Sequence, residues 1–124
     1  MSSSDAKAYI ERATRSFLEE VPALKPLKMV IGVDLVGRGD TQQFKLVMPD
    51  VTVTKDIAAD ARIRVEMRRD VFNKMVEGEA RMVDWRAAVI DGNLKASGIE
   101  QYLKLISQVV EKQVERNRVR RSKA

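Results

Sequence analysis

Carboxylates, lysines and tyrosines are the side chains with which this sequence could perform acid–base chemistry. It contains neither His nor Cys, which excludes the commonest general base near neutral pH, a thiol nucleophile and the commonest transition-metal ligands. Two carboxylate pairs are close in sequence, Glu77 with Glu79 and Asp84 with Asp91. No nucleophile arrangement accompanies them, and such carboxylates are usually solvated surface groups. We therefore predict no catalytic residue, no metal site and no cofactor.

The positive charge of the chain is concentrated at its C-terminus. The sequence has 23 Lys and Arg and 18 Asp and Glu residues, a formal net charge of +5. Five basic residues follow Glu115, the last acidic residue; they are Arg116, Arg118, Arg120, Arg121 and Lys123. The preceding residues are therefore formally neutral, because 23 minus 5 equals the 18 acidic residues.

We expect a basic C-terminal tail over residues 116–124. It would be either a solvated end or a transient contact with an anionic membrane surface. The neutral body shows no basic face with interleaved aromatic residues, which argues against nucleic-acid binding.

The length and composition indicate a single globular domain. The chain has 124 residues, of which 44% are hydrophobic and 33% charged, which is ordinary for a folded soluble protein. No segment approaches the apolar run of about 20 residues that a membrane-spanning helix needs, and the N-terminus lacks a secretory pattern. We expect a cytoplasmic location.

The N-terminal half has the periodicity of a helix followed by strands. Apolar residues recur at helical spacing over residues 5–21, and Pro22 then ends the helix. Period-two alternation predicts strands over 27–36 and 43–48, joined as a hairpin by the Gly-rich turn 37–40. A short β-branched strand over 51–54 and a connector follow.

The C-terminal half alternates strands and helices. Residues 59–68 read as a half-buried strand, and 69–78 as a short amphipathic helix ending at Gly78. Leu94 and Ala96 read as one face of a strand after an Asp-Gly turn. The segment 79–86 reads as a polar connection. From Ile99 to Glu115 the helical stripe is the strongest in the chain. The order predicts an α+β domain with helices packed on a largely antiparallel sheet.

The order of elements and the residues between Asp60 and Gly98 resemble the sterol carrier protein type two family, including its stand-alone bacterial members. The resemblance rests on the strand ending in Met67, the helix over 70–78, the segment from Ala87 to Gly98, and the apolar helix around Leu103. It implies one lipid-binding domain over residues 1–115, with a five-stranded mixed sheet, mostly antiparallel, in the order α-β-β-β-crossover-β-α-β-α. Helices would cover one face, with a hydrophobic tunnel between sheet and helices. The segment 79–86, which carries Trp85, departs from the family's pattern.

The apolar residues that the periodicities turn inward are the candidates for the wall of a ligand cavity. They are Phe44, Met48, Ile63, Met67, Phe72, Met75, Met82, Trp85, Tyr102, Leu103 and Ile106. Taken singly, each can equally be a member of a close-packed core. Methionine is abundant in these elements, and its flexible side chain adapts to irregular or exchangeable partners.

The resemblance implies binding, sequestration or transfer of a hydrophobic ligand, namely a sterol, a fatty acid or a fatty acyl thioester, that the protein does not transform. A partner enzyme would receive or supply that ligand. The alternative is an accessory or catalytic protein of a lipid, steroid or polyketide pathway, in which the same cavity holds a substrate.

Overall fold

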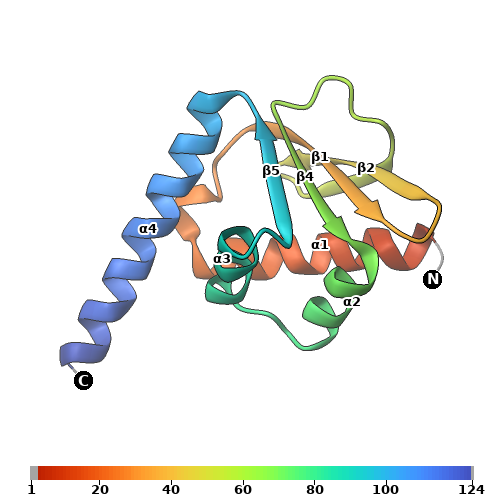
Figure 1. The fold of residues 1–124 in the computed structure, drawn as a ribbon. Helices are drawn as coiled ribbons and strands as arrows, with labels where there is room; N and C mark the ends of the chain where they lie inside the picture. Colours follow the sequence, from red (N-terminus) through yellow and green to blue (C-terminus); the bar gives the residue numbers. More distant parts are fainter. Residues whose placement is uncertain (1–2, 124) are drawn as a thin grey trace.

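The computed structural model describes residues 3–123, with side chains from 5 to 120. Four α-helices, one 3-10 helix and five strands make up the described chain (Figure 1). In chain order they are α1 (Ser3–Glu20), η1 (Pro22–Leu24), β1 (Met29–Val36), β2 (Thr41–Met48), β3 (Thr52–Lys55), β4 (Ile63–Arg68), α2 (Arg69–Glu77), α3 (Met82–Ile90), β5 (Leu94–Gly98) and α4 (Glu100–Lys123).

The five strands form one mixed sheet in the order β3-β2-β1-β4-β5. The β1–β2 hairpin turns at Gly37–Asp40, where Gly39 adopts a positive φ of 82° that favours glycine. After β3 the chain crosses back so that β4 lies parallel to β1, with Ile31 opposite Ile63. The other neighbouring pairs are antiparallel. The predicted mixed, mostly antiparallel sheet is confirmed.

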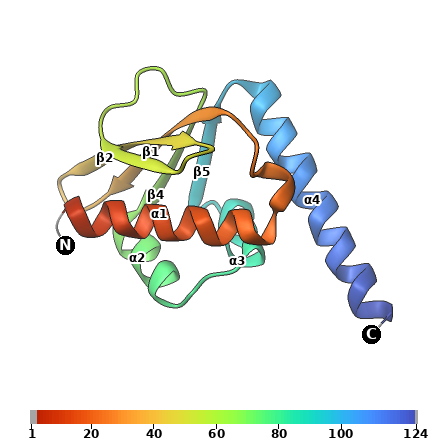
Figure 2. The same ribbon diagram turned by 180° about the vertical axis from the view of Figure 1, so that it is seen from behind.

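The helices cover one face of this sheet. The side chains of Val33, Leu35, Phe44 and Leu46, which alternate along β1 and β2, are at most 6% exposed and belong to the main apolar core. α1 runs along the sheet, α2 and α3 lie next to it, and α4 leaves the body beside β5 (Figures 1 and 2). The core therefore lies between the sheet and the helices. The predicted tunnel in this layer stays a prediction, because the described residues there form a packed apolar cluster.

The opposite face of the sheet carries a polar network. Arg64 Nη1 lies 2.8 Å from Asp34 Oδ1, and the same guanidinium donates hydrogen bonds to the carbonyl oxygens of Ile57 and Ala58. Lys45 Nζ lies 3.0 Å from Asp60 Oδ2. These contacts fasten the β3–β4 connection over the sheet.

Two helices differ from the sequence-based expectation. Residues 82–90 form the separate helix α3, so the prediction of a polar connection there was wrong. Apolar residues occur all around α3, and no stripe marks it in the sequence. The second difference is that α4 continues unbroken from Glu100 to Lys123, so the basic segment after Glu115 is helical.

Candidate functional site

The predicted site residues lie in two environments. Six are buried, each residue at most 7% exposed: Phe44, Met48, Ile63, Met67, Phe72 and Met82. The other five are partly buried: Met75, Trp85, Tyr102, Leu103 and Ile106. All eleven are thus shielded at least in part from water, as either a core or a cavity wall requires.

Eight of these eleven residues are brought together in one apolar cluster. Five belong to the buried core itself, and Met75, Trp85 and Ile106 pack against it. Among the described residues, Ile63, Tyr102 and Leu103 are not part of that cluster. The cluster fills the layer between sheet and helices, and direct contact of its members with a ligand stays a prediction.

Trp85 links this cluster to the surface. Its ring in α3 lies against the ring of Phe72 in α2, with centroids 5.9 Å apart and planes inclined by 44°. Such tilted aromatic pairs add about 0.5–1.5 kcal/mol beyond the area they bury. The pair joins the two short helices and places Trp85 at the border between core and solvent.

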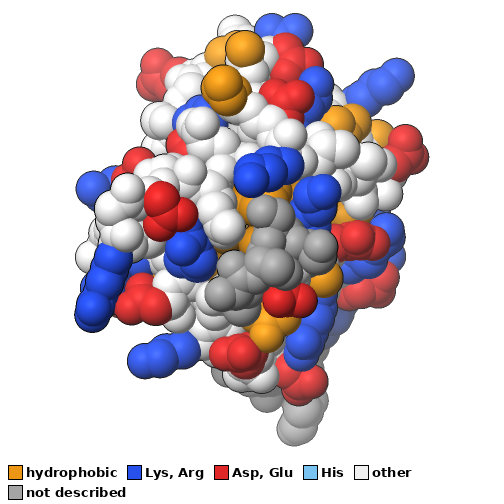
Figure 3. Space-filling model, turned by 90° about the vertical axis from the view of Figure 1, so that its right-hand side faces the viewer, with side chains coloured by type: hydrophobic (Ala, Val, Ile, Leu, Met, Phe, Trp, Pro, Cys, Tyr) orange, Lys and Arg blue, Asp and Glu red, His pale blue; other side chains and the backbone are white. Residues whose placement is uncertain are grey.

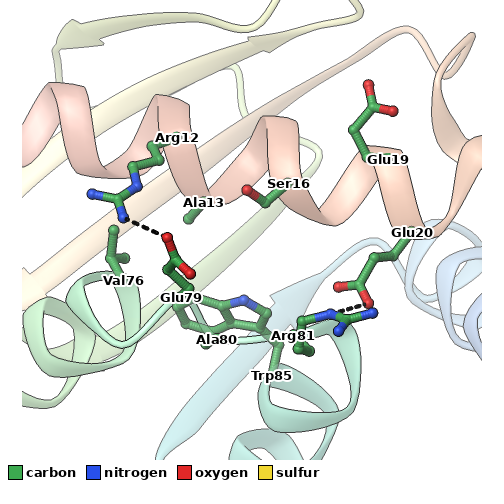
Figure 4. Close-up of a pocket in the computed structure, with 10 residues that line it drawn as sticks. All are labelled: Arg12, Ala13, Ser16, Glu19, Glu20, Val76, Glu79, Ala80, Arg81 and Trp85. Atoms are coloured by element: carbon green, nitrogen blue, oxygen red, sulfur yellow. Dashed lines mark hydrogen bonds and ion pairs between the residues drawn. The ribbon is translucent and has the colours of Figure 1, made fainter.

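A groove with a volume of about 330 Å³ opens beside Trp85. It lies between α1 and the loop 78–81 that connects α2 to α3 (Figure 4). Arg12, Ser16, Glu19, Glu20, Glu79 and Arg81 supply its polar lining, and Ala13, Val76, Ala80 and Trp85 its apolar lining. Because Val76 and Trp85 also pack in the core, the groove adjoins the apolar interior.

Two ion pairs connect the walls of this groove (Figure 4). Arg81 Nε lies 2.7 Å from Glu20 Oε1, while the backbone N–H of Met82 donates to Glu20 Oε2 at 2.6 Å. At the other end Arg12 Nη2 and Glu79 Oε1 are 3.9 Å apart, with 50% and 85% of the side chains exposed. Exposed pairs of this kind contribute roughly 0–1 kcal/mol. The loop is therefore held firmly near Glu20 and weakly near Arg12.

The α1 side of this groove carries no signal in the sequence. The pattern over 5–21 showed only the apolar stripe of the helix, and Glu20 looks like an ordinary surface residue at its end. Its pairing with a residue 61 positions later depends on the tertiary fold. The one partial signal in the sequence is Trp85, which lies in the segment 79–86 that departs from the family's pattern.

Two further contacts hold the helices together. Arg86 of α3 donates two hydrogen bonds of 2.6 Å to the carboxylate of Glu111 in α4, and these bonds lower the pKa of Glu111 from its ordinary value. The hydroxyl of Tyr9 in α1 donates to Glu77 Oε2 in α2 at 2.8 Å, which raises the pKa of Tyr9 above its ordinary value. Both contacts lie on the periphery of the apolar layer.

The carboxylate pairs considered for catalysis are surface groups. Glu77, Glu79, Asp84 and Asp91 are all exposed, and their contacts are structural: Glu77 with Tyr9, Glu79 with Arg12, and Asp84 with the backbone N–H of its own helix start at Arg81. Among the described residues, no group of three or more Asp and Glu side chains is arranged to hold a metal ion. In the same range no helix combines the length and apolarity needed to cross a membrane.

Comparison with known proteins identifies the fold. No protein-family model matches the sequence, and no curated protein sequence matches it. Among solved structures, the palmitated sterol carrier protein 2-like 2 of Aedes aegypti superposes with a TM-score of 0.55, at 15% identity over 82% of this chain and 93% of that one. The sterol carrier protein domain 2 of Helicoverpa armigera gives 0.57, at 11% identity over 88% and 85%.

This chain has the sterol carrier protein 2 fold. The ubiquinone synthesis protein UbiJ-SCP2 has it too, with a TM-score of 0.50 and 22% identity over 87% of this chain and 95% of that one. The resemblance seen in the sequence is thereby confirmed at the level of the fold. In the sterol carrier fold of this chain, the apolar cluster occupies the space between sheet and helices, and the groove beside Trp85 borders it.

Proposed function

We propose that this protein binds a hydrophobic small molecule between its sheet and its helices. The ligand class is a sterol, a fatty acid or a fatty acyl thioester, which the protein sequesters or transfers without transforming it. The observation that carries the proposal is the shared fold with a palmitated sterol carrier protein over 82% of this chain. Burial of apolar ligand surface, at about 25 cal/mol per Å², supplies the driving force.

The make-up of the apolar layer supports this proposal. Met48, Met67 and Met82 are buried there and Met75 packs against them. Unbranched thioethers rearrange more easily than branched side chains, so a ligand chain can take the place of methionine contacts at low cost. A layer built from Leu, Ile and Val alone would resist such an exchange more strongly.

We place the access route at the groove beside Trp85. The loop 78–81 forms one wall of this groove, and the weak Arg12–Glu79 pair ties its near end to α1. Opening the loop there leaves the Glu20 contacts with Arg81 and Met82 intact. The ligand would enter between α1 and this loop.

The basic end of α4 supplies a surface for transient contact with an anionic membrane. Arg116, Arg118 and Arg120 lie on the part of the helix that projects from the body (Figure 1), while the side chains of Arg121 and Lys123 lie outside the described residues. Each basic residue near such a membrane contributes about 1 kcal/mol. Over the face shown in Figure 3, by contrast, side chains of both charge signs are interspersed.

The decisive experiment is native mass spectrometry of the purified protein, followed by extraction of whatever molecule co-purifies. We expect a lipid of fatty-acyl or sterol type, and displacement of a fluorescent fatty acid by that lipid. A protein that carries no lipid and also fails to bind the fluorescent fatty acid would contradict the proposal.

Membrane contact is tested separately with vesicles. Full-length protein should bind vesicles containing phosphatidylserine more strongly than neutral phosphatidylcholine vesicles, and moderate salt should weaken that binding through screening. Replacing Arg116, Arg118 and Arg120 together by Gln should reduce the difference strongly, because only Arg121 and Lys123 then remain in the basic segment. Vesicle binding that is unchanged by salt and by these replacements would contradict the proposed membrane contact.

A second candidate function is that of an accessory protein that presents its ligand to a pathway enzyme. The fold shared with the ubiquinone synthesis protein favours it. Co-purification of a stable enzyme partner would support this candidate. Turnover of a bound substrate by the purified protein alone would instead indicate that the chain is itself an enzyme.

A further inference from the structure

Three polar side chains are carried by elements that come together at the end of the apolar layer near the β1–β2 turn. Gln42 lies directly opposite Leu35 in the hairpin, so its side chain is on the face that the helices cover. Arg69, the first residue of α2, reaches over the same strand end, with Nη2 3.5 Å from the carbonyl oxygen of Leu35. Asn73 follows one helical turn after Arg69 and therefore lies on the same side of α2.

Each of these side chains buries a polar atom that has no hydrogen-bond partner among the described residues. The atoms are Gln42 Oε1, Arg69 Nε and Asn73 Oδ1. Most buried polar atoms in folded proteins are paired, since leaving one unpaired costs about 1–3 kcal/mol. Within the described residues, these are the buried side-chain atoms that lack a partner. Their gathering in one corner suits a polar group supplied from outside the chain.

The corner adjoins the predicted ligand layer. Phe44 lies two residues after Gln42 on the same face of β2, and Phe72 precedes Asn73 in α2. Both phenylalanines belong to the apolar core. A ligand whose chain lies in that layer can therefore bring its end group to Gln42, Arg69 and Asn73.

The hydrogen-bonding capacity and charge of the corner select the type of end group. A hydroxyl suits this corner, because it can accept a hydrogen bond from Arg69 Nε–H and donate its single hydrogen bond to one of the two oxygens. The Arg69 guanidinium is already paired with the carboxylate of Asp40, with Nη2 2.8 Å from Oδ2. That pairing offsets the positive charge, which favours a neutral group over a carboxylate.

We propose that Gln42, Arg69 and Asn73 form a recognition site for the hydroxyl group of a lipid alcohol. The inference rests on the proposed function, because it requires a ligand in the apolar layer. The hydroxyl donates to Gln42 Oε1 or Asn73 Oδ1 and accepts from Arg69 Nε–H. The three residues thus determine the ligand's orientation and its preference for an alcohol.

The test compares two ligands of equal chain length on the full-length protein. Hexadecan-1-ol can donate a hydrogen bond, whereas its methyl ether can only accept one. Affinities are measured by displacement of a fluorescent fatty acid. We expect wild-type protein to bind the alcohol about tenfold more tightly than the ether, because the alcohol donates a hydrogen bond to one of the buried oxygens and the ether donates none.

The variant for this test is Gln42→Leu combined with Asn73→Leu, which removes both acceptors at similar volume. It should bind alcohol and ether equally, near the wild-type affinity for the ether. Gln43→Leu, the same change one residue later on the opposite sheet face, is the matched control and should keep the preference. Gln42→Leu alone and Asn73→Leu alone should each show a smaller preference for the alcohol over the ether. These single variants provide the test if the double variant does not fold.

Three results would overturn the inference. They are equal affinities for alcohol and ether in the wild type, a preference that persists in the double variant, and tighter binding of palmitate that depends on Arg69. In each of these cases ligand binding itself survives, so the proposed function stands. Failure of all probes to bind the wild type would instead remove the proposed function, and this inference with it.

Discussion

The ring of Phe72 in α2 lies against the ring of Trp85 in α3, with the two centroids 5.9 Å apart. Phe72 belongs to the buried core, and Trp85 also lines the groove at the surface. This pair is therefore the direct contact between the apolar layer and the proposed access route.

Ligand binding should change the fluorescence of Trp85. It is the single Trp of the chain, so its emission reports on this contact alone. We expect a shift of the emission maximum on titration with palmitate or hexadecan-1-ol, and a smaller shift in Phe72→Leu, which loses the ring contact. Trp85→Phe, assayed by probe displacement, controls for binding itself. Binding that leaves the emission unchanged would place the ligand away from this pair.

Replacing Met67 by Ala should weaken both the fold and ligand binding. Met67 is 4% exposed within the core, so truncation should lower the free energy of unfolding by about 2–4 kcal/mol, as measured by urea denaturation. Leu46→Ala, also 4% exposed and on the same face of the sheet, is the matched control. We expect comparable destabilisation in both variants and altered ligand affinity only in Met67→Ala. Equal effects of both on affinity would mean that Met67 is ordinary core.

The Arg86–Glu111 pair should make stability depend on pH in the acidic range. Arg86 lowers the pKa of Glu111 below its ordinary value of 4.5. Because the pKa of Glu111 is lowered in the folded state, the ion pair contributes fully to the free energy of unfolding above pH 4.5. This contribution disappears as the pH falls through the pKa of Glu111 in the folded protein. The urea midpoint of Arg86→Gln should therefore lie below that of the wild type at pH 7, and this gap should narrow at low pH.

Other acidic groups, including Asp60 and Asp70, also have a lowered pKa, so the comparison requires a double-mutant cycle with Glu111→Gln. The Arg86→Gln effect should be lost in the Glu111→Gln background. A difference in urea midpoint between wild type and Arg86→Gln that stays constant from pH 7 to low pH would contradict this role of the Arg86–Glu111 pair.

Removing Asp34 should loosen the β3–β4 connection without affecting ligand binding. Its side chain is 11% exposed and pairs with Arg64, which also binds the carbonyl oxygens of Ile57 and Ala58. Asp34→Ala leaves that guanidinium without its carboxylate, and we expect a loss of about 3 kcal/mol in unfolding free energy. Hydrogen exchange should increase around Ile57. Because the network lies on the sheet face away from the helices, a matching loss of ligand affinity would contradict the proposed location of the ligand.

Strongly periodic segments made much of the fold predictable. The alternation along 27–36 and 43–48 and the Gly-rich turn gave the hairpin, although β1 starts at Met29. The helix over 69–78 and the strand containing Leu94 and Ala96 were also found. α3 was missed because Val83, Val89 and Ile90 are exposed in the folded chain, so its apolar residues do not form one stripe.

The sequence by itself determined the α+β class, the order of most elements, the apolar residues of the layer and the position of the basic end. These properties follow from side-chain periodicity and composition, which are local. Only the tertiary structure decided that β4 pairs with β1, that Glu20 fastens the α2–α3 loop, and that Gln42, Arg69 and Asn73 each bury an unpaired polar atom. Such contacts join residues up to 62 positions apart, and they depend on how the helices pack on the sheet rather than on any repeat along the chain.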